Sequence, residues 1–307
     1  MNPSRTPSAS VLYPQLAPAK INLGLHVIRR RDDGYHDLET VFLRVPWADR
    51  LSVRPAARLR MTCSDPALPT DERNLCMKAA RALQTAAGVT AGAALHLDKR
   101  LPYGAGLGGG SSDAATTLRL LAALWNVAIP PDRLHAIGAA LGSDVPFFLG
   151  PPAAYATGRG ERLEPLYDPA TQALYRCPFP LVIAVPPVHV ATPDAYRRVV
   201  PRSTGRADLR QVVVSNDLDR WRAELVNDFE APVAAAYPPV AEALHLLRQA
   251  GAGYAALSGS GGAVFGVFVG EAPARAAAAQ ARRAGWRVWW GYAGDAEASS
   301  SSSSSGA

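Results

Sequence analysis

The stretch LPYGAGLGGGSSDAATTL, residues 101–118, places five glycines and two serines directly before a helix-like pattern. Glycine lacks a Cβ and tolerates positive φ, so such a backbone can bring N–H groups close to an anion. The free N–H groups and the dipole of a helix start favour anions further. The stretch therefore predicts a phosphate-binding loop, with a flexible surface loop as the plainer alternative.

Two common phosphate motifs do not explain this stretch. Gly104, Gly106 and Gly109 match the dinucleotide fingerprint, but that motif needs a strand after the helix and an acidic residue about twenty positions on. Here two prolines and a second helical pattern follow the first helix. The P-loop motif needs a lysine where Gly110 stands.

Alternation of apolar and polar residues predicts a strand at 17–28, with Lys20 and Asn22 on one face. Asp33-Gly34 predicts a hairpin turn into a strand at 35–45. The other elements expected in the first half are strands at 51–60, 93–98 and 153–157, and helices at 74–87, from an N-cap at 111–113 to 125, and at 130–141.

The pattern restarts near residue 173. The expected elements are strands at 179–185, 254–269 (two strands around a glycine turn) and 286–292, and helices at 222–237, 239–250 and 271–284. Mixed elements of this kind predict an α+β protein of two domains. We expect an N-terminal domain at 1–170, with a loose arm at 1–13, a C-terminal domain at 171–297, and a disordered serine-rich tail at 298–307.

Composition limits the classes of function. The 307 residues include 32 Lys plus Arg against 26 Asp plus Glu, a net charge of +6, which suits phosphate-rich ligands. The arginines are scattered, so no nucleic-acid footprint is expected. Three cysteines without CxxC spacing argue against a disulfide framework and a zinc site, and favour the cytoplasm. The absence of a long apolar run predicts no membrane span.

The glycine stretch resembles the phosphate-binding motif of the galactokinase, homoserine kinase, mevalonate kinase and phosphomevalonate kinase (GHMP) superfamily. The matching residues are Pro102 and GLGGGSSD at 106–113. Two more of its motifs are present, APAKINL at 17–23 and LSGSGGAVF at 257–265. The resemblance implies an N-terminal domain like the second domain of ribosomal protein S5 and a ferredoxin-like C-terminal domain.

Two further strings, RDDGYHDLET at 31–40 and LGSDVPFF at 141–148, resemble the kinases of this superfamily that act on 4-diphosphocytidyl-2-C-methyl-D-erythritol. This resemblance implies that ATP phosphorylates the 2-hydroxyl of the methylerythritol moiety, in the non-mevalonate isoprenoid pathway. It also implies Mg²⁺ as a cofactor and a small-molecule substrate as the partner. We expect neither nucleic acid nor membrane as partners, and a monomer or weak homodimer.

The resemblance implies that Asp144 is the general base and that Lys20 assists it. A carboxylate near an alcohol can accept its proton during phosphoryl transfer, and a nearby positive charge offsets charge in the transition state. Without the resemblance, Asp144 would be read as the cap of a short turn, and Lys20 as a solvated edge residue.

For the substrate, the resemblance points to Asn22, Tyr35 and His36 near the cytosine base, since aromatic rings suit the π face of a base. The segment PVHVATPDAY at 187–196 adds Thr192 and Tyr196. The likeliest contacts in the third motif are Gly259, Ser260 and Gly261, although that motif alone also fits a plain hairpin.

For ATP, the resemblance assigns the glycine stretch itself, namely Pro102, Gly104, Gly106, Leu107, Gly108, Gly109, Gly110, Ser111 and Ser112. Asn74 and Lys99 are expected near the adenine or ribose. Ser112 is the nearest candidate for a protein ligand of Mg²⁺.

Two other functions compete with this reading. Another kinase of the superfamily, such as homoserine or mevalonate kinase, would use the same loop on a different alcohol, but Asp33-Gly34-Tyr35-His36 argues against it. A nucleic-acid-binding protein would use the basic surface, but would leave the phosphate cradle unexplained.

Overall fold

The computed structural model describes residues 12–294. The predicted arm at 1–13 lies almost wholly, and the tail at 298–307 wholly, outside these residues. Contacts divide the described chain into two compact units. Unit 1 comprises 12–17, 48–100 and 110–149, and unit 2 comprises 18–47, 101–109 and 150–294.

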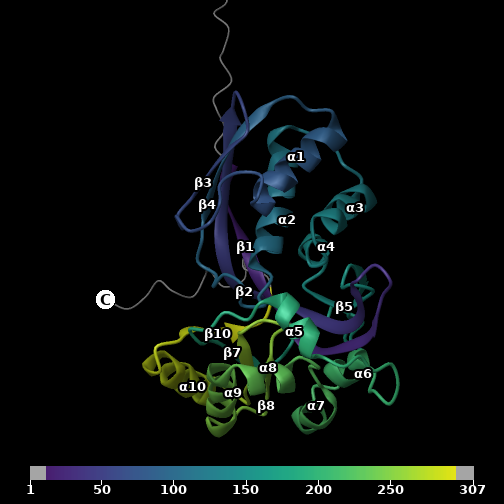
Figure 1. Ribbon diagram of the computed structural model, residues 1–307, viewed down its shortest axis with the longest axis vertical. Coiled ribbons are helices and arrows are strands. Elements are labelled where there is room, and N and C mark those ends of the chain that lie inside the picture. The colour runs from purple at the N-terminus through teal and green to yellow at the C-terminus, as the bar shows by residue number, and fades with distance from the viewer. Residues whose placement is uncertain (1–11, 295–307) are drawn as a thin grey trace, which may run out of the picture. The chain divides into compact units, whose positions relative to one another are not determined.

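Unit 1 contains a small sheet with helices. Its strands are β3 (Arg60–Cys63), β4 (Gly92–Asp98) and residues 48–56 of β2 (His36–Ala56). Strand β4 runs antiparallel to β2 and parallel to β3. The helices are α1 (Leu75–Ala87), α2 (Gly109–Leu124, its first residue in unit 2), α3 (Pro131–Leu141) and α4 (Val145–Leu149) (Figure 1).

The ends of these helices follow from local chemistry. The Asn74 side chain caps α1 by accepting a hydrogen bond from the Cys76 N–H at 2.9 Å, and Gly88 ends the helix at φ 66°. Helix α3 begins with a proline and ends at Gly142, as predicted. Helix α2 begins at Gly109, before the predicted cap at 111–113, which was therefore wrong. Glycine at the start leaves the two serines inside the first turn.

Unit 2 contains most of β1 (Leu12–Arg30), which pairs with β2, followed by β5 (Ala153–Thr157) and β6 (Arg162–Pro165). Strand β2 is unbroken, although two strands were predicted over its length. Apolar residues of β1 such as Ile21 are buried as expected, but Lys20 and Asn22 on the other face are buried too. The interpretation of Lys20 as a solvated edge residue is therefore wrong.

A second sheet of unit 2 has the strand order β10-β7-β9-β8 and is antiparallel throughout. Its strands are β7 (Pro180–Val185), β8 (Tyr254–Leu257), β9 (Val264–Val267) and β10 (Arg287–Tyr292). Helices α9 (Pro238–Gln249) and α10 (Glu271–Arg283) pack against this sheet (Figure 1). All residues of β7, β8 and β9 are buried, which explains their continuous apolar sequences.

The remaining helices are α5 (Thr192–Arg198), α6 (Leu209–Val214), α7 (Leu218–Glu224) and α8 (Glu230–Ala236). The single helix predicted at 222–237 was wrong, because residues 225–229 interrupt it. The Leu25 N–H donates to the Val226 carbonyl at 2.8 Å, and the Asp228 N–H donates to the Leu25 carbonyl at 2.9 Å. Pairing with β1 thus replaces helical hydrogen bonds there.

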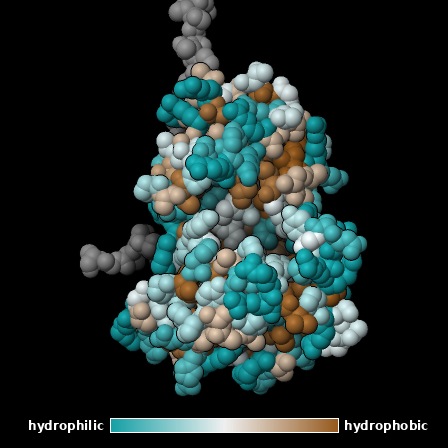
Figure 2. Space-filling model, viewed as in Figure 1, coloured by the Kyte–Doolittle hydropathy of each residue, from teal (hydrophilic) through white to brown (hydrophobic). Residues whose placement is uncertain are grey.

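Within residues 12–294, no helix is both long and apolar enough to cross a membrane. On the face shown in Figure 2, hydrophilic residues are interspersed with small patches of hydrophobic residues.

Candidate active site

Three sequence motifs meet within unit 2. They are β1 near Lys20, the glycine loop (residues 101–109) and the SGSGG turn (residues 258–262). The Lys20 N–H donates to the Leu107 carbonyl at 2.9 Å, and the Ala263 N–H donates to the Ala105 carbonyl at 2.9 Å. The glycine loop is therefore held by main-chain hydrogen bonds on both sides.

Two glycines allow the glycine loop and the SGSGG turn to cross. A Cβ on Gly106, which has φ 83°, would collide with the Ser258 carbonyl oxygen, and a Cβ on Gly261 would collide with the Gly106 nitrogen. Backbone atoms on both sides cannot move aside easily. The sequence suggested that these glycines expose N–H groups to an anion, but here they also permit backbone to pack on backbone.

Lys20 lies at this crossing, with 4 % of its surface exposed. Its ammonium donates to the Asn22 Oδ1 at 2.8 Å and to the Gly106 carbonyl at 3.0 Å. The same carbonyl accepts from the Ser258 hydroxyl at 3.3 Å. A buried ammonium needs such acceptors, because an unsatisfied buried charge is costly.

The predicted substrate residues form two pairs in unit 2. The rings of His36 and Tyr196 have centroids 4.7 Å apart, and Tyr196 packs edge-on against Phe229. The Ser260 hydroxyl lies 3.4 Å from the Thr192 hydroxyl. Burial, and secondarily Arg30, lowers the pKa of His36, so its neutral imidazole can both donate and accept a hydrogen bond.

Tyr35 stands apart from these pairs as a largely exposed ring. The guanidinium carbon of Arg159 lies 5.0 Å from its centroid. Tyr35 follows the turn predicted at Asp33-Gly34, which the structure confirms with a Gly34 N–H to Arg31 carbonyl hydrogen bond of 3.1 Å.

Residues Gly110, Ser111 and Ser112 form the first turn of α2 in unit 1. The N–H groups of a first helical turn have no partner within the helix. The Ser112 hydroxyl is buried and has no hydrogen-bond partner among residues 12–294. This orphaned oxygen fits a ligand group at the helix start, including a hard cation such as Mg²⁺.

Lys99 is fully engaged in a buried ion cluster of unit 1. Its ammonium lies 2.5 Å from Asp49 Oδ2 and 2.8 Å from Asp113 Oδ2. Burial alone would lower the pKa of Lys99, but the two carboxylates outweigh it and raise the pKa. Burial raises the pKa of Asp113 above its ordinary value, against the attraction of Lys99.

The other residue predicted near the adenine, Asn74, uses its side chain locally. Besides capping α1, its Nδ2 donates to the Pro69 carbonyl at 2.8 Å. The nucleotide contacts expected of Asn74 and Lys99 stay predictions.

Asp144 is half-buried and directly precedes α4 in unit 1. A turn, closed by a hydrogen bond of 3.1 Å from the Val145 N–H to the Gly142 carbonyl, presents it. Gly142 in turn lies beside the Ser111 hydroxyl at the start of α2. The catalytic role of Asp144 stays a prediction.

Sequence reasoning missed three buried polar residues of unit 2, Thr40, Ser258 and Asn227. Asn227 Nδ2 donates to the carbonyls of Leu257 and Gly259 and so supports the SGSGG turn. The sequence feature that could have revealed Asn227 is the pair Asn227-Asp228 inside the helix predicted at 222–237, because both residue types are unfavourable inside a helix. Thr40 carried no signal, because a threonine is ordinary in a strand.

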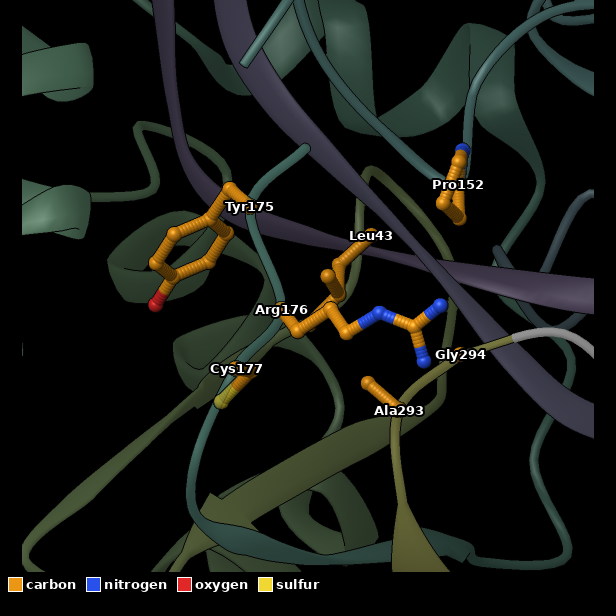
Figure 3. A pocket seen from close by; sticks show the side chains of 7 residues that line it. All are labelled: Leu43, Pro152, Tyr175, Arg176, Cys177, Ala293 and Gly294. Carbon is orange, nitrogen blue, oxygen red and sulfur yellow. The ribbon is translucent and has the colours of Figure 1, made fainter. Parts of the chain in front are cut away.

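A small pocket of unit 2 is lined by none of the predicted residues. Figure 3 shows its lining residues, Leu43, Pro152, Tyr175, Arg176, Cys177, Ala293 and Gly294.

Comparison with known proteins places this arrangement in a family. Residues 74–150 match the family GHMP kinases N terminal domain, and residues 208–286 match GHMP kinases C terminal. A homoserine kinase from Cytophaga hutchinsonii shares the fold, with a TM-score of 0.70 at 18 % identity over 95 % of this chain and 98 % of that one. The fold and the three motifs define a GHMP kinase of two-domain α+β architecture, as predicted.

The relatives of higher identity carry one name. The chain is 59 % identical to a 4-diphosphocytidyl-2-C-methyl-D-erythritol kinase of Salinibacter ruber, over 86 % of this chain and 92 % of that protein. It is 49 % identical to the enzyme of the same name from Chlorobium phaeobacteroides, over 81 % and 87 %. A crystal structure of 4-(cytidine 5'-diphospho)-2C-methyl-D-erythritol kinase matches with a TM-score of 0.76 at 40 % identity, covering 92 % and 99 %. The chain belongs to the 4-diphosphocytidyl-2-C-methyl-D-erythritol kinase family.

Proposed function

We propose that this kinase transfers the γ-phosphoryl group of ATP to the 2-hydroxyl of 4-diphosphocytidyl-2-C-methyl-D-erythritol, in the non-mevalonate isoprenoid pathway. The observation that carries the proposal is the 59 % identity to a relative of that name over 92 % of its length. The strings at 31–40 and 141–148 support the same substrate.

The proposal names residues 1–170 the ATP-binding domain and residues 171–297 the substrate-binding domain, with the substrate residues Asn22, Tyr35 and His36 lying in the first. The two family matches, at 74–150 and 208–286, fall inside these ranges. A cytoplasmic location and a monomer or weak homodimer complete the proposal.

Asp144 is the proposed general base. As the substrate hydroxyl oxygen bonds to the γ-phosphorus, the bond from that phosphorus to the bridging oxygen of ADP breaks, and Asp144 takes the hydroxyl proton. A half-buried carboxylate at the end of a turn keeps enough access to a ligand for this role.

Lys20 is the proposed electrostatic partner of the reaction. Hydrogen bonds to Asn22 and Gly106 orient its buried ammonium. An oriented charge in a water-poor site stabilises the charge that develops on the transferring phosphoryl group.

The proposed ATP-binding residues are those of the glycine loop and, next in sequence, those of the first turn of α2. Positive φ values of 67°, 83° and 70° at Gly104, Gly106 and Gly108 suit a loop that turns its N–H groups to an anion. Gly109, Gly110, Ser111 and Ser112 continue the site, flanked by Pro102 and Leu107. When bound, Mg²⁺ would neutralise phosphate charge, with the unpartnered Ser112 hydroxyl as its protein ligand.

The proposed cytidine site is the His36–Tyr196 pair with Thr192, and Tyr35 is assigned to this site from the resemblance. A cytosine base can stack on these rings, and the neutral imidazole of His36 can form a hydrogen bond with the edge of the base. Asn22, Gly259, Ser260 and Gly261 would contact the methylerythritol diphosphate.

A substrate panel tests the activity. The enzyme receives Mg-ATP with 4-diphosphocytidyl-methylerythritol, homoserine or mevalonate in turn, and ADP release is followed. We expect turnover with the first alcohol only. Turnover with homoserine or mevalonate alone, or retained RNA binding in salt without ATP turnover, would contradict the proposal.

The variant Asp144→Asn tests the base. We expect kcat to fall by about 10²- to 10⁴-fold with the affinity for ATP little changed, because only proton transfer is lost. Asp132→Asn, an exposed aspartate in the first turn of α3, is the matched control. Unchanged turnover in Asp144→Asn would remove this residue from the mechanism.

A further inference from the structure

A buried chain of hydrogen bonds continues from Lys20 through β1 to β2. Lys20 donates to Asn22 Oδ1 at 2.8 Å, and Asn22 Nδ2 donates to Thr40 Oγ1 at 2.9 Å. Thr40 Oγ1 in turn donates to the Gly24 carbonyl at 2.6 Å. Asn22 has 2 % of its surface exposed and Thr40 none. All members of the chain belong to unit 2.

The direction of this chain follows from its last bond. A carbonyl only accepts, so the single hydroxyl proton of Thr40 must point to the Gly24 oxygen. Thr40 then offers only lone pairs to Asn22, and the amide must turn its NH₂ group toward Thr40. The amide oxygen is thereby directed at the Lys20 ammonium, which only donates.

The chain of hydrogen bonds ends at a backbone irregularity in β1. Gly24 has φ 74°, inside a strand, and a Cβ there would lie 2.8 Å from the Leu209 Cδ2. Glycine is therefore required at this position.

We propose that Thr40 is a positioning residue for Lys20, acting through the orientation of the Asn22 amide. This inference rests on the proposed catalytic role of Lys20. Without an acceptor at Thr40, the buried NH₂ group of Asn22 loses its partner, which is costly, and only Lys20 still favours this orientation of the amide. A flipped amide would present its NH₂ group to the ammonium, and Lys20 would lose one of the acceptors that orient it.

The variant Thr40→Val tests this inference, because valine has nearly the shape of threonine and no hydroxyl. We expect kcat with the cytidyl substrate to fall by about tenfold to a hundredfold, since small displacements of a catalytic group have effects of this size. The KM for ATP should change little. Thr40→Ser keeps the hydroxyl and should restore most of kcat, which a loss of packing alone would not predict.

The matched control is Thr116→Val in α2. Thr116 is equally buried, but its hydroxyl has no hydrogen-bond partner among residues 12–294. It should keep the wild-type kcat. If Thr40→Val does not fold, Thr40→Ala removes the same acceptor with less crowding and is measured in its place.

A double-mutant cycle with Lys20→Met separates this inference from the proposed function. If Thr40 acts through Lys20, the Thr40 substitution should have almost no effect on kcat in the Lys20→Met background. Equal effects in both backgrounds, or a wild-type kcat in Thr40→Val, would overturn the inference. Wild-type activity in both Lys20→Met and Asp144→Asn would instead overturn the proposed mechanism.

Discussion

Two lysines that precede the glycine loop in sequence, Lys20 and Lys99, both have buried side chains, and their hydrogen bonds differ within their own units. The Lys99 ammonium lies between the carboxylates of Asp49 and Asp113 in unit 1. The hydrogen bonds of Lys20 described above go to an amide oxygen and a carbonyl oxygen in unit 2. A carboxylate neutralises the charge of an ammonium, and a hydrogen bond to an amide or carbonyl oxygen fixes its direction. We infer that Lys99 serves mainly stability and Lys20 mainly catalysis.

The largest expected effect is the loss of the Lys99 charge. Lys99→Met should lower the free energy of unfolding by about 3–5 kcal/mol, because two buried carboxylates lose their counter-charge. Denaturant titration measures the change, with the exposed Lys78→Met as control. Combining Lys99→Met with Asp49→Asn and Asp113→Asn should recover much of the loss. A stable Lys99→Met protein with a raised KM for ATP would instead favour the nucleotide role.

The second effect concerns the Lys20 charge. Lys20→Met should lower kcat by about 10²- to 10³-fold, the range found when one oriented electrostatic group is removed. Steady-state kinetics at saturating ATP and a parallel unfolding curve measure the two losses separately. The comparison of the two lysines fails if Lys20→Met loses stability as Lys99→Met does but keeps its kcat.

A third buried ionisable group, His26, differs from the two lysines because burial disfavours its charged form. Burial, followed by the positive charge of Arg206, lowers its pKa from 6.5 to about 4. Between these values the unfolded chain binds a proton that the folded chain does not. Stability should therefore fall as the pH drops through this window, by about 3 kcal/mol in total. His26→Gln should remove this acid-side loss in unfolding curves at pH 6.5 and 4, whereas the exposed His245→Gln should retain it.

The smallest expected effect concerns Gly104, in the glycine loop that contacts Lys20. Gly104 has φ 67°, and a Cβ there would meet the imidazole of His189, an exposed side chain that can move aside. Gly104→Ala should cost about 1 kcal/mol, mainly for the left-handed backbone. Gly106→Ala should cost more, because its Cβ meets backbone atoms, and it should also lower kcat by moving the carbonyl that binds Lys20. Equal unfolding curves for the two variants would contradict a fixed crossing at Gly106.

Much of the fold could be predicted from periodicity and turn chemistry. The strand around Lys20, the turn at Asp33-Gly34, the helix end at Gly142 and the strand pair around 258–262 follow from local sequence. The break of the predicted helix at 225–229 did not, because its cause is pairing with β1, more than two hundred residues away in the chain. Local propensity carries no information about such a partner.

By itself, the sequence determined the kind of protein, because glycine spacing and the strings around Lys20, His36 and Asp144 are local patterns that record a chemistry. Tertiary structure alone decided how the buried charges are used. It set Lys99 between two carboxylates, crossed Gly106 with Gly261, and aimed Asn22 at Lys20 through Thr40. The physical reason is that a hydrogen bond or a counter-charge depends on distance and direction between atoms that the chain brings together only on folding.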